Sequence, residues 1–139
     1  MDQLAEAEND LRRIIALSPN DAAALNALGY TLADRTDRLD EAYEYISRAY
    51  SITPDDPAVM DSMGWVEYLK GNTQAALIKL RAAMKAMPDH EIAAHLGEVL
   101  WVVGKPEEAR QVWLQGLELK PESPVILKTL DKFEVEIKP

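Results

Sequence analysis

The sequence predicts an all-α fold, a right-handed superhelical solenoid of antiparallel helix pairs. Prolines recur along the chain at intervals of 35, 34 and 33 residues, at Pro19, Pro54, Pro88 and Pro121. An alanine precedes each proline by twelve residues, and apolar residues lie at helical spacing between them. A repeat of this length indicates one helix pair per unit, and the pairs must stack because one pair alone cannot bury its apolar face.

The segment 1–19 matches only the second helix of such a unit, with Leu11 and Ile14 in register. Its first helix is missing, whereas a solenoid is expected to begin with a polar-faced cap. We therefore expect the chain to have been cut from a longer protein. The alternative interpretation is a natural N-terminal capping helix.

Three complete units follow, at 22–54, 57–88 and 90–121. The second unit shows the pattern most clearly. Its turn is predicted at Gly71-Asn72, and Pro88 ends its second helix. The one-residue changes in period are placed in the turns, the first in ADRTDRLDE and the second at MPDHE.

A capping helix is predicted at 123–135, because Pro124 suits a first helical turn and apolar residues follow it at helical spacing. The final VEIKP is expected to be frayed. Residues 1–139 would thus form a single domain of about three repeats, an N-terminal half repeat and a C-terminal capping helix.

Composition narrows the class of partner. The 139 residues are 47% apolar and carry a net charge of −9 without any cysteine, which excludes disulfides and thiolate metal sites. The acidic balance argues against nucleic acid or an anionic membrane as partner and favours a basic or neutral protein surface. No segment is apolar over the roughly 18 residues that a membrane span requires, so we expect no direct membrane insertion by this chain.

The residues offer little for catalysis. His90 and His95 are the two histidines, and their spacing of five places the rings about 140° apart on a helix, so they cannot share a metal as HExxH motifs do. His90 is also predicted to fall in the turn between units. No nucleophile with a suitable base is apparent. We predict no enzyme activity, no metal and no cofactor, and an enzymatic hypothesis would depend on these two histidines alone.

Binding is expected on the concave surface, which the first helix of each unit lines. The repeat register predicts its residues. The predicted groove comprises Asn26, Tyr30, Asp61, Ser62, Trp65, Tyr68, His95, Glu98 and Trp101. The same register adds Ala27, Asp34, Leu69, Glu91, Val102, Lys128, Thr129 and Lys132.

Four of the nine aromatic residues lie in this predicted groove, where aromatic side chains with a polar group are common binding anchors. For Trp65 and Trp101, packing against the neighbouring helix is the alternative. Trp113 occupies a register position between helices and is predicted to be core.

The three units resemble tetratricopeptide repeats over nearly the whole chain. More narrowly, DSMGWVEYLKGN and HLGEVLWVVGKPEEARQVW resemble the C-terminal repeats of Gram-negative outer-membrane lipoproteins of this repeat class. That resemblance implies a lipid-anchored protein on the periplasmic side of the outer membrane that scaffolds a carboxyl-terminal processing protease. A cytoplasmic location is the alternative, because the anchor residues are not in this sequence.

Another binding mode of these repeats is disfavoured. Chaperone-binding members grip a terminal carboxylate with a clamp of cationic and amide side chains. The corresponding positions here hold Ala23, Ala27, Ser62, Glu91 and His95. The required cations are absent, and Glu91 would repel a carboxylate.

These observations predict a protein-protein interaction scaffold. Its groove would take a peptide or helix with apolar anchors and basic neighbours, lying against Trp65, Tyr68 and Trp101 beside Asp61 and Glu98. The alternative is self-association or assembly, because the N-terminal half unit is predicted to expose an apolar helix face.

Overall fold

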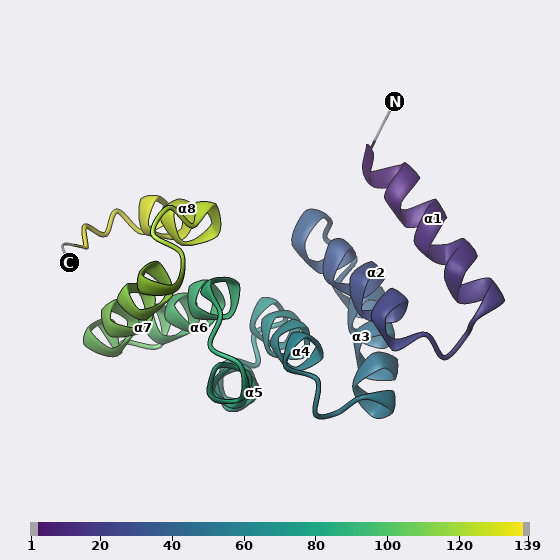
Figure 1. The fold of residues 1–139 in the computed structure, drawn as a ribbon, viewed down its shortest axis with the longest axis horizontal. Helices are drawn as coiled ribbons and strands as arrows, with labels where there is room; N and C mark the ends of the chain where they lie inside the picture. Colours follow the sequence, from purple (N-terminus) through teal and green to yellow (C-terminus); the bar gives the residue numbers. More distant parts are fainter. Residues whose placement is uncertain (1–2, 138–139) are drawn as a thin grey trace.

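Eight α-helices make up the part of the chain that this computed structural model describes, residues 3–137 (Figure 1). Short turns separate them, and no strand occurs within that range. The helices are α1 (Gln3–Leu17), α2 (Ala22–Arg35), α3 (Leu39–Ile52), α4 (Pro57–Leu69), α5 (Thr73–Ala86), α6 (His90–Val102), α7 (Pro106–Leu119) and α8 (Pro124–Lys132). The predicted all-α solenoid is confirmed.

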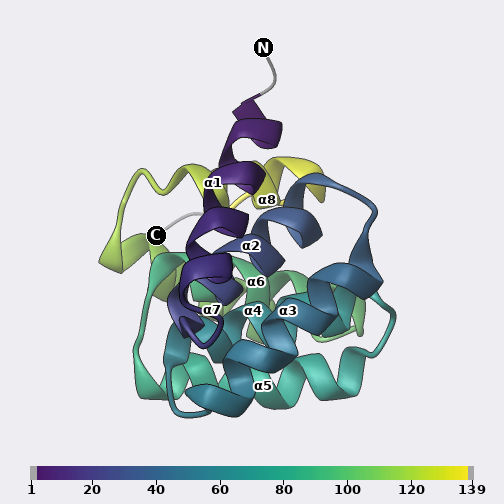
Figure 2. The same ribbon diagram turned by 90° about the vertical axis from the view of Figure 1, so that its right-hand side faces the viewer.

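The helices form an inner and an outer layer. Figure 1 shows α2, α4 and α6 following one another along the inner side of an arc, with α3, α5 and α7 outside them. Each inner helix packs most extensively on the outer helix that follows it. Helix α8 packs on α6 and thereby extends the inner layer, while the view along the arc shows α1 at its other end (Figure 2).

Side-chain caps distinguish the two layers. Each inner helix starts after a residue whose side chain accepts a hydrogen bond from a backbone N–H of the first turn: Asp21, Asp56, Asp89 or Ser123. The outer helices α3, α5 and α7 have no such bond. A cap that satisfies these free N–H groups defines where the helix begins. The start of every groove-lining helix is therefore specified by a local residue.

Glycines make the turns inside the second and third pairs. Gly71 and Gly104 adopt φ values of +92° and +89°, a conformation that other residues rarely tolerate. The first pair turns without glycine, and there the Thr36 hydroxyl donates to the carbonyl of Leu32. The turns within the pairs are therefore of two kinds, two with a glycine and one with a threonine hydrogen bond.

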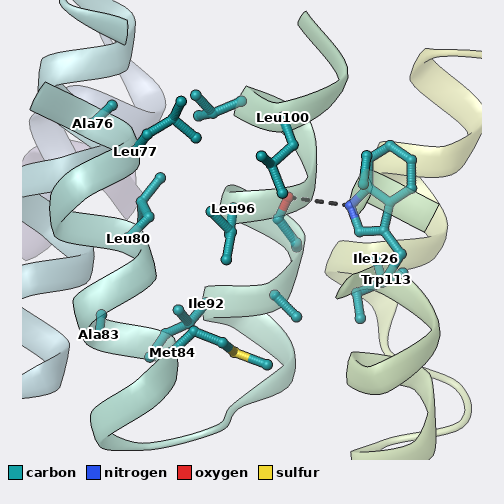
Figure 3. Close-up of a cluster of buried hydrophobic side chains, with 14 of the residues drawn as sticks. Ala76, Leu77, Leu80, Ala83, Met84, Ile92, Leu96, Leu100, Trp113 and Ile126 are labelled. Atoms are coloured by element: carbon teal, nitrogen blue, oxygen red, sulfur yellow. Dashed lines mark hydrogen bonds between the residues drawn. The ribbon is translucent and has the colours of Figure 1, made fainter. Parts of the chain in front are cut away.

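Close helix contact determines the core. Trp113 of α7 is completely buried and its indole N–H donates to the Ala94 carbonyl of α6 at 3.4 Å (Figure 3). A Cβ atom added to Gly97 would lie 2.1 Å from Trp113 Nε1. The tryptophan therefore fits only because α6 carries glycine opposite it. The prediction that Trp113 is core is confirmed.

Helix α1 lacks the cover that the other outer helices have. Ala42 and Ile46 of α3 are fully buried, whereas Ala7 and Leu11, their counterparts in α1, are only half-buried. None of the described residues of α1 is buried, and Leu17 is 86% exposed. The half unit therefore leaves one helix face open to solvent.

Ion pairs attach α1 to the first complete pair. Arg12 contacts Glu8 at 2.6 Å and Glu41 of α3 at 2.9 Å, and Arg38 contacts Glu8 at 2.7 Å. Both arginines hold the pKa of the Glu8 carboxyl below its usual range. Charge thus supplements the limited apolar burial at this end.

Two expectations about the C-terminal part need correction. Helix α8 ends at Lys132 rather than at residue 135. The frayed end is wrong for residues 135–137, because Val135 N–H donates to the Leu130 carbonyl and Val135 and Ile137 pack on the core. Residues 138–139 of that segment, and residues 1–2 of the predicted first helix, lie outside the described range.

The placement of His90 in a turn is also wrong. His90 is the first residue of α6, and its Nδ1 lies 2.7 Å from Ser123 Oγ. The capping residue Asp89, whose side chain accepts from the N–H groups of Glu91 and Ile92, makes His90 the first helical residue. In addition, none of the described helices combines the length and apolar character needed to cross a bilayer.

Candidate functional site: the concave groove

Two neighbouring hollows lie over the inner helices. The large hollow has a volume of about 700 Å³ and the acidic hollow about 310 Å³. Tyr30 lines both of them. The large hollow is otherwise lined by Ala33, Asp34, Trp65, Leu69, His95, Glu98, Pro124, Val125, Lys128, Thr129, Asp131 and Lys132. The acidic hollow is otherwise lined by Asn26, Ala27, Ala58, Asp61, Ser62, Met87, Asp89, Glu91 and Ile92.

A hydrogen-bonded triad joins three inner helices beneath the two hollows. His95 Nδ1 of α6 lies 2.8 Å from Asp61 Oδ1 of α4, and His95 Nε2 lies 3.2 Å from the Tyr30 hydroxyl of α2. An ionised carboxylate can only accept, so His95 Nδ1 donates to Asp61. In the neutral ring, Nε2 then accepts from Tyr30. This chain of bonds fixes the spacing of the three helices at the groove floor.

Burial and charge act in opposite directions on His95. Burial lowers the pKa of the imidazole, but the negative charges of Asp61, Asp34 and Glu91 outweigh burial and raise the pKa above its ordinary value. The pKa of the Tyr30 hydroxyl is also raised, first by burial and then by the same carboxylates. Acidic groups thus surround the triad.

Trp65 covers this triad. Its ring stacks on His95 with a centroid distance of 4.2 Å and an interplanar angle of 25°, and it contacts Tyr68 at 5.1 Å. Only 8% of Trp65 is exposed, although it lines the large hollow. Its buried indole Nε1 has no hydrogen-bond partner in the part of the chain described. Trp65 is therefore both a packing residue and part of the hollow's wall.

Glu98 is already paired. Its Oε2 accepts from the Tyr68 hydroxyl at 2.9 Å and from Lys132 Nζ at 2.9 Å, and only 4% of the residue is exposed. The pKa of Tyr68 is raised by burial and by the adjacent Glu98 charge. Lys132 attaches α8 to α6 by this ion pair. The negative charge of Glu98 is therefore balanced by Lys132, and less of it is available to a ligand.

The predicted groove residues are not all brought together. Asn26, Tyr30, Asp61, Ser62, Trp65, His95 and Glu98 line one or other hollow. Tyr68 lines neither but bonds to Glu98. Trp101 lies elsewhere, between Trp113 and Phe133, with ring centroids 5.9 and 6.4 Å away. Arg110 covers its ring at 5.3 Å.

The register missed lining residues of three kinds. Ala33, Ala58 and Ile92 lie on inner helices at positions that the register did not select. Met87 and Asp89 belong to the connection between α5 and α6, which a pattern of helix positions does not describe. Val125 and Asp131 belong to α8, which departs from the repeat. One signal was present in the sequence: Asp61 and His95 are 34 residues apart, close to one repeat, so they lie near each other on consecutive inner helices.

The described residues contain no group of three or more His, Asp or Glu side chains arranged to hold a metal ion. What the groove offers is an apolar wall, paired charges and a set of hydrogen-bond acceptors.

Comparison with known proteins agrees with this architecture. A family model described as "Tetratricopeptide repeat" matches residues 1–57. A TPR repeat-containing protein of Pseudomonas aeruginosa, PA4667, is 51% identical over 95 residues. That match covers 68% of this chain and 16% of the relative, so the chain spans about one sixth of the relative's length.

Solved structures with similar folds share little sequence. TTC0263, a TPR protein of Thermus thermophilus, has a TM-score of 0.78 at 19% identity, covering 95% of this chain and 74% of that chain. MamA has a TM-score of 0.69 at 17% identity, covering 97% and 86%. Taken together, the family model and the relative support a tetratricopeptide-repeat protein, and the solved structures share its fold.

Proposed function

We propose that this chain is a non-catalytic segment of an interaction scaffold, and that its large hollow binds a peptide or helical segment of a partner protein. Tetratricopeptide-repeat folds support protein-protein interaction in general. The observation that carries the finer proposal is the large hollow itself, which residues of α2, α4, α6 and α8 line jointly. A ligand there would contact every inner helix at once.

The lining favours an apolar anchor in the partner segment. Leu69 and Val125 are half-buried and offer apolar surface beside Trp65. Burying such surface contributes roughly 25 cal/mol per Å². Basic residues next to the anchor would meet Asp34, which is exposed, rather than Glu98, which Lys132 neutralises.

The partner we propose is a carboxyl-terminal processing protease, and the proposed location is the periplasmic side of the outer membrane. Both come from the resemblance of the second and third repeats to lipoproteins of this kind. The 51% identity to the Pseudomonas relative supports a bacterial tetratricopeptide-repeat protein.

The test compares two substitutions by affinity for the purified protease from the same organism. Leu69→Lys places a charge in the large hollow. Ile78→Lys is the matched control, because Ile78 lies on outer helix α5 and is 69% exposed. We expect Leu69→Lys to weaken binding at least about tenfold, a typical loss for a buried interface residue, and Ile78→Lys to leave it unchanged. Thermal unfolding of both variants checks that each remains folded.

Equal affinity of the two variants would contradict the groove as binding surface. Absence of protease binding by the parent chain, when the full-length protein does bind, would assign that partner to other repeats.

Self-association is the second candidate function, and the open face of α1 favours it. Ile14 is 43% exposed and Leu17 is 86% exposed on a helix without buried residues. An assembly in which a second apolar surface covers these two side chains would be stabilised. If this face mediates assembly, light scattering should give a mass that rises with concentration, and Ile14→Glu should abolish the rise. A constant monomer mass would dismiss the idea.

A further inference from the structure

We infer that the acidic hollow is a binding site for an arginine side chain carried by the same partner segment. The inference rests on the proposed function, because it assigns a second contact within the groove. Three carboxylates line this hollow, those of Asp61, Asp89 and Glu91, and none of its lining residues is Lys or Arg.

The carboxylates retain free acceptor capacity. Asp61 uses Oδ1 for His95, and Asp89 uses Oδ2 to cap α6, which leaves one oxygen of each. Glu91 is exposed, and the described residues form no ion pair with it. Each carboxylate oxygen accepts more than one hydrogen bond. The hollow therefore has more acceptors than the molecule itself satisfies.

Two uncharged groups point to the same kind of ligand. Ser62 is only 4% exposed, yet no described residue hydrogen-bonds to its hydroxyl. The buried Asn26 Oδ1 also lacks a partner within the described residues. A buried polar atom such as Asn26 Oδ1 is normally paired, and leaving it unpaired costs free energy. A ligand that donates several hydrogen bonds would satisfy them.

Arginine fits these acceptors better than lysine. Its guanidinium carries five N–H donors in a planar fork, whereas lysine presents three from one point. Met87, 46% exposed, and Ala58 supply apolar surface for the methylene stem. The hollow, at about 310 Å³, is much smaller than its neighbour and suits one side chain rather than a chain segment.

The two hollows are adjacent, so the apolar anchor and the arginine can belong to one partner segment. Tyr30 lines both hollows, so a segment with its apolar anchor in the large hollow can extend an arginine directly into the acidic one. The structure therefore assigns to the partner an arginine close to an apolar anchor.

Titration of the ¹⁵N-labelled 139-residue chain with N-acetyl-arginine amide tests the site without the partner. A ligand of this size is expected to bind with a dissociation constant in the millimolar range. We expect saturable shift changes in the amides of residues 58–62, 87 and 89–92. N-acetyl-citrulline amide, which has a similar shape and no charge, should produce none.

Two variants with equal loss of charge sharpen the test. Glu91→Gln removes a charge from the hollow and should weaken arginine amide binding about three- to tenfold. Glu44→Gln removes one from an exposed position on α3 and should leave the affinity unchanged. Both positions are exposed, so neither change should disturb the fold.

The inference would be overturned by equal shifts with the citrulline probe, by shifts confined to the large hollow, or by no saturable shift up to about 50 mM. Equal affinity of Glu91→Gln and parent would overturn it as well. Its failure is distinguishable from failure of the proposed function, since protease binding that depends on Leu69 would persist without an arginine site.

Discussion

At the scale of single residues, the fit between Gly97 and Trp113 shows how the repeat tolerates a large core residue. Counterparts of Trp113 are Ile46 in α3 and Leu80 in α5, and each faces a glycine of the preceding helix. The glycine lets two helices approach, and the residue opposite it fills the remaining space. Each repeat therefore pairs a glycine on its inner helix with a large apolar residue on its outer helix.

Gly97→Ala should therefore destabilise the protein by about 1–3 kcal/mol, a usual cost of overpacking, although alanine favours helix more than glycine does. Urea unfolding of the 139-residue chain measures the change. Combining it with Trp113→Leu should cost less than the sum of the two single changes, because the smaller side chain leaves room for the methyl group. Additive costs would show that the clash with Trp113 is not the cause.

Protonation of His95, at the groove, should make the stability of the protein depend on pH. Its pKa is raised on folding because the carboxylates of Asp61, Asp34 and Glu91 outweigh the opposing effect of burial. A group with a raised folded-state pKa contributes its full stability below the unfolded value, near 6.5, and loses it as the pH rises through the folded value.

The free energy of unfolding should accordingly fall as the pH rises above about 6.5, the unfolded histidine pKa. Urea unfolding across this range measures the slope. His95→Gln should remove the decline, while His90→Gln, at the start of α6, should retain it. An equal slope in the parent and in His95→Gln would contradict the role given to His95.

At the scale of helices, α1 and α5 carry equivalent residues in different surroundings. Leu80 of α5 is fully buried against α4, while Leu11 of α1, which packs only on the cluster formed by α2, α3 and α4, is half-buried. A leucine at this position therefore stabilises the fold more in α5, which has its partner helix α4, than in α1.

Leu80→Ala should cost about 2–5 kcal/mol, the usual range for a buried leucine, and Leu11→Ala less than half of that. Chemical denaturation of the two variants gives the comparison. Hydrogen exchange of the parent should also show less protection in α1 than in α5, since stability follows local burial. Equal costs at the two positions would indicate that a partner covers α1 in solution.

At the scale of the whole molecule, the repeat period was sufficient to predict the solenoid, because regularly placed prolines and small residues specify where helices end and cross. The same register placed Tyr30, Trp65 and His95 together on one surface. It could not show that Glu98 is neutralised, because that depends on Lys132 of α8. Nor could it show that Phe133 and Arg110 cover Trp101, since these contacts come from the irregular C-terminal segment and the outer layer.

The central claim is that the groove of α2, α4, α6 and α8 is the partner-binding surface, and photocrosslinking in the source organism tests it most directly. The full-length protein would carry a photoreactive phenylalanine at position 69 or, as control, at position 78. We predict a specific protein adduct from position 69 and none from position 78, because Leu69 lines the large hollow and Ile78 lies on the outer layer. The same adduct from position 78 alone would contradict the claim and move the binding surface to the outer helices.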